Sequence, residues 1–112
     1  LALAQCVIYL ATAPKSNAAH KALNLAKTSA EKSGSLSPPL HVLNAPTRLM
    51  ENLGYGKEYK YDHDSEQGFS GQNYFPDRLV PEKFYQPIER GFEREIIKRL
   101  SYWDKLRQIK NQ

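Results

Sequence analysis

The stretch ERGFEREIIKRLSYWDKLRQIK, residues 89–110, decides the fold class of this 112-residue chain. Apolar side chains recur in it with the i, i+4, i+8, i+11 and i+14 spacing of one helix face: Phe92, Ile96, Leu100, Trp103 and Leu106. This period predicts an amphipathic helix. Glu95 precedes Arg99 by four residues, the order that favours a helical ion pair. We expect the apolar face to cover the domain's own core, with a partner helix as the alternative.

Two more helices are predicted before this one, on either side of a proline. Residues 1–13 have apolar side chains at helical spacing and precede Pro14, which cannot continue a helix. Too short to span a membrane, they include Cys6, the only cysteine, which we expect to pack as a small hydrophobe. A second helix is expected from Ser16, a good N-cap residue, to a stop at Gly34.

A short third helix, TRLMENL, is predicted after Pro46, and Gly54 is expected to end it. Its buried face would consist of Leu49, Met50 and Leu53. The residues that follow, Gly54 to Lys57, look like the start of a phosphate-binding loop. Such a loop needs a glycine at the position of Glu51 and a hydroxyl at that of Glu58. We therefore interpret this stretch as a turn in which Gly54 and Gly56 take conformations that other residues resist.

Residues 55–87 form a long connector rich in aromatic side chains. EYKYDH (58–63) and KFYQP (83–87) have the composition of two short strands that pair. The aromatic residues are expected to pin this connector to the helices. The candidates for an aromatic core or an oligomer interface are Tyr59, Tyr61, Phe84, Tyr85 and Trp103. The predicted fold is mainly α-helical, with this connector and at most one short two-stranded β pair.

No catalytic, cofactor or metal site is predicted. Asp62 and Asp64 flank His63, but no second histidine or cysteine lies nearby to complete a metal shell, so a solvated turn is the favoured interpretation. His20 and His41 are isolated from any nucleophile or paired carboxylates.

The net charge of +4 is concentrated at the two helical ends of the chain. Residues 55–87 carry four basic and six acidic side chains, which argues against an aromatic groove that binds single-stranded nucleic acid. The candidate nucleic-acid contacts are instead Lys15, Lys21 and Lys27, with a solvated basic face as the alternative. One thiol and no glycosylation sequon predict a reducing, cytoplasmic setting.

Several longer strings carry a resemblance to a known family. They are AQCVIYLATAPKSNAAHKAL, PLHVLNAPTRLMENLGYGKEYKYDHD, GQNYFPDRL and KFYQPIERGFEREI, which together span most of the chain. They resemble the C-terminal domain of the RarA/MgsA family of AAA+ ATPases, which is related to clamp-loader subunits and includes the Werner helicase interacting protein.

The resemblance implies that residues 1–112 are one C-terminal oligomerisation domain, similar to clamp-loader collars, that assembles a homotetramer. It implies a fragment without the AAA+ core, the lid and the first helices of this domain, so ATP and Mg²⁺ would bind elsewhere. The full-length family members act at replication forks in the cytoplasm, near the nucleoid, with single-stranded DNA-binding protein and fork DNA as partners. A nucleic-acid or fork-protein binding module is the alternative function, and an independent enzyme is a remote third.

Overall fold

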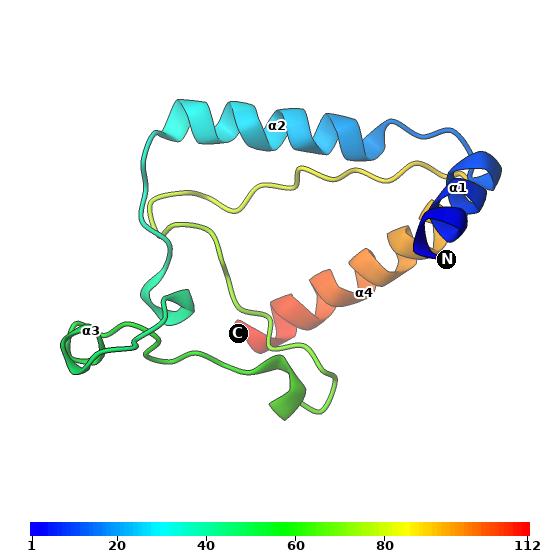
Figure 1. Cartoon of the computed structure of the whole chain (residues 1–112). Helices are drawn as coiled ribbons and strands as arrows, with labels where there is room; N and C mark the ends of the chain where they lie inside the picture. The colour runs from blue at the N-terminus through cyan, green and yellow to red at the C-terminus, as the bar shows by residue number, and fades with distance from the viewer.

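The computed structural model describes residues 1–112 and contains helices but no strand (Figure 1). The four α-helices are α1 (Ala2–Thr12), α2 (Ala18–Ser33), α3 (Arg48–Asn52) and α4 (Glu93–Lys110). Two 3-10 turns, Leu40–Val42 and Asp62–Asp64, lie before and after α3. The prediction of a mainly helical fold is confirmed.

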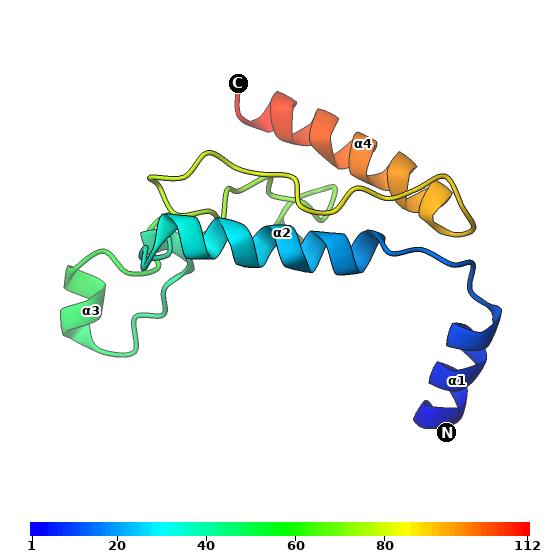
Figure 2. The same cartoon turned by 90° about the horizontal axis from the view of Figure 1, so that it is seen from above.

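The helices form an open frame and do not pack against one another. No residues of two different helices have Cα atoms within 8 Å of each other. Figures 1 and 2 both draw the extended chain of residues 72–88 between α2 and α4. The same views place α1 and α3 at opposite ends of the molecule, whose longest dimension is 51 Å. The extended chain therefore takes the place that a neighbouring helix has in a bundle.

The open frame leaves most of the chain in contact with solvent. Its accessible surface is 9592 Å², whereas a compact monomer of this mass exposes about 6,300 Å². Its radius of gyration is 17.8 Å, compared with about 13 Å for a compact domain of this length. Four residues are buried: Ala18, Pro39, Ser70 and Gly71. No large apolar side chain is among them, so the chain has no complete core of its own.

The start of α4 is set by a turn at Gly91, and the helix therefore begins four residues later than predicted. Gly91 has φ +51°, a left-handed conformation that favours glycine. A Cβ atom at this position would lie 2.5 Å from Cγ of Pro14. The Glu93 carboxylate accepts a hydrogen bond of 2.6 Å from the N–H of Ile88. The linker between α1 and α2 is thus packed against the first turn of α4.

The predicted pairing of residues 58–63 with residues 83–87 is wrong, because side chains satisfy the backbone instead. The Gln72 amide accepts a hydrogen bond from the N–H of Lys60 (3.0 Å) and donates one to its carbonyl (2.6 Å). Gln72 therefore gives Lys60 the two backbone bonds that a neighbouring strand would supply. The other segment lies beside α4, where Lys83 pairs with Asp104.

The apolar face of α4 is only partly covered by the chain's own residues. Gly71 packs against the helix, since its Cβ position lies 3.6 Å from Cα of Arg107. Phe92 remains exposed and Trp103 is 40% exposed. The expected packing of this face on an internal core is therefore incomplete.

The predicted ion pair of Glu95 with Arg99 is replaced by one with a closer neighbour. Lys98 donates to the Glu95 carboxylate at 2.8 Å, and this hydrogen bond lowers the pKa of Glu95. The Arg99 guanidinium lies 5.8 Å from the centre of the Phe92 ring. Arg99 thus stacks on the exposed ring of Phe92, and Lys98 forms the ion pair with Glu95.

Candidate self-association surface

Helix α1 presents apolar side chains to solvent along its whole length. Residues 1–13 contain no charged side chain. Leu3 is 84% exposed and Leu10 is 68% exposed, and with Cys6 and Val7 they lie on one face at i, i+3, i+4 and i+7. A helix with this composition is normally buried in a protein interior. The expectation that Cys6 packs as a buried hydrophobe is not met within this chain, where it is exposed.

The C-terminal end of α1 is the part that approaches the rest of the molecule. Burial raises the pKa of the half-buried Tyr85 phenol, and the nearby Glu93 carboxylate and Tyr9 of α1 add to the rise. In the linker that follows α1, the carbonyl of Lys15 accepts a hydrogen bond of 3.3 Å from Arg90. From this anchored end, α1 projects away from the other helices (Figure 2).

A second apolar surface lies on the α3 lobe, which we define as residues 40–57. The side chains of Leu40, Leu49 and Leu53 are exposed on it, and Leu49 is 68% exposed. The prediction that Leu49 and Leu53 are buried is therefore wrong, since no other helix approaches α3. Met50 is half-buried, and its N–H donates to the Thr47 hydroxyl that caps α3.

The glycine-flanked lysine stretch shapes this lobe and takes the predicted turn conformation. Gly54 and Gly56 have φ of +89° and +73°, which confirms that they adopt conformations other residues resist. The N–H of Gly56 donates to the carbonyl of Leu40 at 2.6 Å and closes α3 onto the preceding 3-10 turn. A Cβ at Gly56 would lie 3.2 Å from the carbonyl oxygen of Leu43, so the turn is also tightly packed.

The five aromatic candidates do not form a cluster. Tyr59 and Tyr61 are exposed, and Tyr61 lies beside His63 at 4.9 Å between ring centres. Trp103 stacks on Phe69 at 6.3 Å, and Phe84 contacts Phe75 at 5.9 Å. Tyr85 lies near α1, as described above. In place of one aromatic cluster, Tyr61, Phe84 and Trp103 each pair with a different ring, and Tyr59 and Tyr85 lie apart from these pairs.

The three lysine candidates for nucleic-acid contact lie apart from one another. Lys21 and Lys27 are both exposed on α2 but are separated by about 120° around the helix axis. Lys15 lies in the linker before α2, with its carbonyl bound to Arg90. Lys21 and Lys27 therefore do not share a face of α2.

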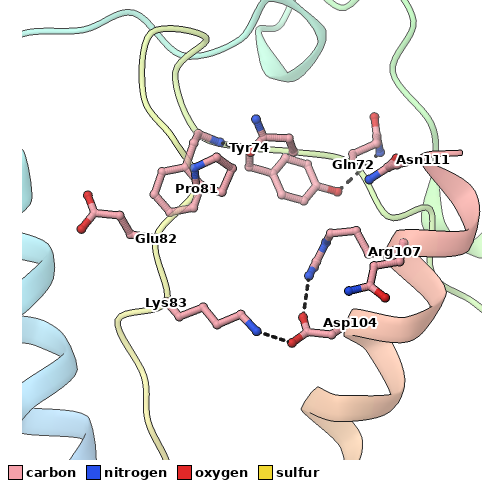
Figure 3. Close-up of a pocket in the computed structure, with 11 residues that line it drawn as sticks. Gln72, Tyr74, Pro81, Glu82, Lys83, Asp104, Arg107 and Asn111 are labelled. Atoms are coloured by element: carbon pink, nitrogen blue, oxygen red, sulfur yellow. Dashed lines mark hydrogen bonds and ion pairs between the residues drawn. The ribbon is translucent and has the colours of Figure 1, made fainter.

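A hollow of about 590 Å³ lies between the extended chain and the end of α4 (Figure 3). Asp104 accepts hydrogen bonds from Lys83 and from Arg107, the latter at 3.0 Å. Gln72 and Tyr74 line the opposite wall, where Nε2 of Gln72 lies 3.4 Å from the hydroxyl oxygen of Tyr74. The four charged side chains that line this hollow, Glu82, Lys83, Asp104 and Arg107, sum to zero, so it has no excess charge of one sign with which to select an ionic ligand.

The Asp62–Asp64 turn has a structural role in the connector. The Asp62 carboxylate accepts a hydrogen bond of 2.8 Å from the N–H of the buried Ser70. Hydrogen bonding by Ser70 lowers the pKa of Asp62. No group of three or more histidine, cysteine, aspartate or glutamate side chains is arranged to hold a metal ion.

One buried side-chain polar atom has no hydrogen-bond partner. Nε2 of His41 is buried without a hydrogen-bond partner, beside a second hollow of about 590 Å³ that Tyr59 and Tyr74 also line. In the sequence, His41 lies apart from any nucleophile or paired carboxylates. Neither its burial nor its neighbours, which lie far away in the sequence, could be read from the local pattern.

None of the helices combines the length and apolar character that crossing a membrane would require.

The chain is similar to a family of known proteins. Residues 1–104 match the family model described as "MgsA AAA+ ATPase C terminal". Replication-associated recombination protein A of Coxiella burnetii is 49% identical over 109 residues, which cover 96% of this chain and 25% of that protein. The protein of the same name from Escherichia coli K12 is 41% identical over 90% of this chain and 23% of its own length.

A eukaryotic relative extends the match. ATPase WRNIP1 of Dictyostelium discoideum is 37% identical over 76% of this chain and 10% of its own length. The chain thus spans about a quarter of the length of the bacterial relatives and less of the eukaryotic one. Because the family model covers nearly all of it, the chain belongs to the family of MgsA AAA+ ATPase C-terminal domains.

Proposed function

We propose that this chain is the non-catalytic self-association domain of an AAA+ ATPase, and that it assembles a homotetramer. The observation that carries the proposal is the exposed surface, which exceeds that of a compact monomer by about 3,300 Å². A standard protein interface buries about 800 Å² on each partner. The excess is therefore large enough for contacts with more than one neighbour.

The position of the exposed apolar residues supports the same proposal. Nine of the 19 exposed large hydrophobic side chains lie in two groups at opposite ends of the molecule, six in residues 1–10 and three on the α3 lobe. Concentrated apolar surface of this kind marks sites of protein–protein contact. The exposed candidates Tyr59, Tyr61 and Trp103 could add aromatic anchors, which are enriched in interfaces.

The activity of the whole protein belongs to the same proposal. Its relatives carry the name replication-associated recombination protein A, so we propose a role in replication-associated recombination. ATP and Mg²⁺ would bind in the AAA+ core outside residues 1–112. Single-stranded DNA-binding protein and fork DNA are the proposed partners of the full-length protein. In this arrangement the present domain holds the ATPase modules together and performs no chemistry itself.

Absolute mass in solution tests the proposal. We would measure it by light scattering across a dilution series at two salt concentrations, with the protein expressed from the whole reading frame that encodes residues 1–112. A tetramer, or a smaller species that grows with concentration, is the expected result. A monomer at every concentration would overturn the proposal. Salt should change the mass little, because burial of apolar surface is not screened.

A second function, binding of nucleic acid, is favoured by one observation on α4. Arg94, Lys98 and Lys105 are all exposed and lie within about 40° of one another around the helix axis. Of the three acidic residues of α4, Glu93 accepts from Ile88 and Asp104 pairs with Lys83, whereas Glu95 pairs with Lys98 and leaves Arg94 and Lys105 as the excess charge of this face. The face formed by these three side chains is therefore basic and suited to phosphate contacts.

Fluorescence anisotropy with a labelled single-stranded oligonucleotide tests this function. Reversing the charges of Arg94, Lys98 and Lys105 together should weaken binding at least tenfold, and higher salt should have the same effect. Reversing Lys21 and Lys27, which share no face, is the matched comparison. Binding that is equally lost in both variants would contradict a site on α4.

A further inference from the structure

Residues 60–72 form a loop that is closed by its own hydrogen bonds. Its two ends are joined through the side-chain amide of Gln72, which accepts from the N–H of Lys60 at 3.0 Å and donates to the Lys60 carbonyl at 2.6 Å. The same amide donates to the Ser70 hydroxyl at 2.8 Å. Compact surface loops of about 6–16 residues, with ends close together and their own side chains packed inside, are Ω-loops. The length and the closure of residues 60–72 fit this class.

Side chains also hold the interior of this loop. The Asp62 carboxylate accepts a hydrogen bond of 2.8 Å from the N–H of Ser70. The Ser65 hydroxyl accepts one of 2.7 Å from the N–H of Phe69 and donates one of 3.0 Å to the carbonyl of Asp62. Both partners of each of these bonds lie within residues 60–72, so the loop needs no other element to fix its shape.

The loop lies against the C-terminal half of α4 through contacts of a different kind (Figure 1). The Phe69 ring stacks on Trp103, and the Arg107 guanidinium lies 5.3 Å from the centre of the same ring. The backbone of Gly71 packs on the helix, with its Cβ position 3.6 Å from Cα of Arg107. None of the hydrogen bonds of residues 60–72 reaches α4. The loop is thus held together by hydrogen bonds and held to the helix by ring and backbone packing.

We propose that residues 60–72 are a preformed cap on α4, which docks on the helix and leaves it as a unit. Undocking gives up the contacts of Phe69 and Gly71 but none of the hydrogen bonds inside the loop. Proteins open locally in contiguous cooperative units of this kind. Undocking would bare the side of Trp103 that Phe69 covers, together with the Arg107 guanidinium, so a molecule that binds there would shift the cap toward its open position. The device works within one chain and goes beyond the proposed self-association.

Two measurements follow the two sets of contacts separately. Hydrogen exchange, read by mass spectrometry on peptides from residues 60–72, reports the bonds inside the loop. Fluorine-labelled tryptophan, read by fluorine NMR, reports the contact of Trp103 with Phe69, and the variant Trp103→Phe identifies its resonance. Both measurements use the protein expressed from the whole reading frame that encodes residues 1–112, and circular dichroism of each variant checks that its helices are retained.

The variant Phe69→Ala removes the docking ring and leaves the bonds of the loop in place, because Phe69 takes part in them only through its N–H. The Trp103 resonance should move toward the position of a solvent-exposed indole, while exchange within the loop should change less than about threefold. Phe75→Ala is the matched control. It removes a half-buried phenylalanine of the connector that contacts Phe84 instead, and it should leave both measurements unchanged.

The variant Asp62→Ala tests the opposite direction. Without the carboxylate that accepts from Ser70, exchange within the loop should rise about tenfold or more. The Trp103 resonance should then move as well, because a loop that has lost its shape cannot present Phe69 and Gly71 to the helix together. In the unsubstituted protein, rising urea should move the Trp103 resonance at a lower concentration than the one at which the loop loses its protection.

Several results would overturn the inference. Exchange about tenfold faster in Phe69→Ala would mean that the loop owes its shape to α4. A Trp103 resonance that stays in place in Phe69→Ala or in Asp62→Ala would mean that docking does not depend on the ring or on the shape of the loop. Coincident urea transitions of the two measurements would mean that the loop and its docking contact unfold together. None of these results depends on the mass of the protein in solution, so the proposed function is tested separately.

Discussion

Helices α1 and α4 differ in where their neighbours come from. The 18-residue α4 receives Gly71 against its backbone, the Phe69 ring against Trp103 and an ion pair from Lys83, all from the same chain. The 11-residue α1 is approached only near its C-terminal end, at Tyr9. Isolated helices shorter than about 12–15 residues are marginal in water. We therefore expect the stability of α1 to depend on more contacts than residues 1–112 provide.

The comparison distinguishes apolar surface that is buried within one chain from apolar surface that we propose is buried between chains. Contacts with α4 fasten one long connector to one long helix and should determine the stability of the single chain. The apolar faces of α1 and α3 contribute little to that stability and should determine association. Substitutions in the two regions are therefore expected to change different measurements.

The largest effect is expected from charges on α1. The double variant L3D/L10D removes two leucines from an apolar contact, and fully burying one leucine contributes about 1.5–3 kcal/mol. Association should weaken at least a hundredfold, which light scattering would record as a fall to the monomer mass. Ser101→Asp, on the exposed side of α4, should leave the mass unchanged. Equal assembly of both variants would contradict the division between the two helices.

A smaller effect is expected at the junction of α1 with α4. In Gly91→Ala, the new Cβ meets the Pro14 ring at 2.5 Å and the residue keeps φ +51°. The left-handed conformation and the overpacking together should lower the free energy of unfolding by about 2–4 kcal/mol.

The matched control for this junction is Gly68→Ala. Gly68 has a similar φ of +61°, but no atom lies within 4 Å of its Cβ position. The Gly68→Ala substitution should lower the free energy of unfolding by about 1 kcal/mol, because only the left-handed conformation is unfavourable. Urea denaturation measures both free energies of unfolding. Similar values for the two variants would mean that the Pro14 contact does not hold the junction.

A moderate loss of stability is expected from truncation of Trp103. Replacing a fully buried tryptophan by alanine costs about 3–5 kcal/mol, and the partial exposure of Trp103 should reduce this to about 2 kcal/mol. Tyr102→Ala, one residue away on the exposed side, should cost about 0.5 kcal/mol or less. Thermal unfolding distinguishes the two, and a larger shift for Tyr102→Ala would contradict the Phe69–Trp103 contact.

The smallest effect concerns the pH dependence of the connector. The Ser70 hydrogen bonds lower the pKa of Asp62 below its ordinary value of 3.8. A lowered pKa means that the ionised carboxylate stabilises the folded turn above pH 3.8, and that this contribution disappears as the pH falls through the lower, folded-state pKa. NMR of the Ser70 amide should show a transition with a midpoint below 3.8. The variant Asp62→Asn should abolish it, and an unchanged transition would assign it to another group.

The sequence predicted the helices well because their signals are local. The proline after α1, the glycine after α2 and the apolar period of α4 each act within a few residues, and the observed helices lie close to the expected bounds. The conformations of Gly54 and Gly56 follow from the same local reasoning.

The errors concern partners that lie far away in the sequence. The strand pair was wrong because the Gln72 side chain, twelve residues from Lys60, supplies the backbone bonds. The buried faces of α1 and α3 were expected from apolar patterning, which shows that a side chain requires cover but not which chain provides it. No pattern within 112 residues could reveal that the cover is missing here.

The absence of packing between the four helices has a consequence for the life of newly made copies in a cell. If the proposed self-association holds, a domain that cannot complete a core from its own residues would gain resistance to proteases on association, because binding to the folded form removes copies from the unfolded population. Cellular proteases continuously degrade unfolded copies. The steady amount of this domain should therefore rise more steeply than its rate of synthesis, and surplus copies should have short lifetimes.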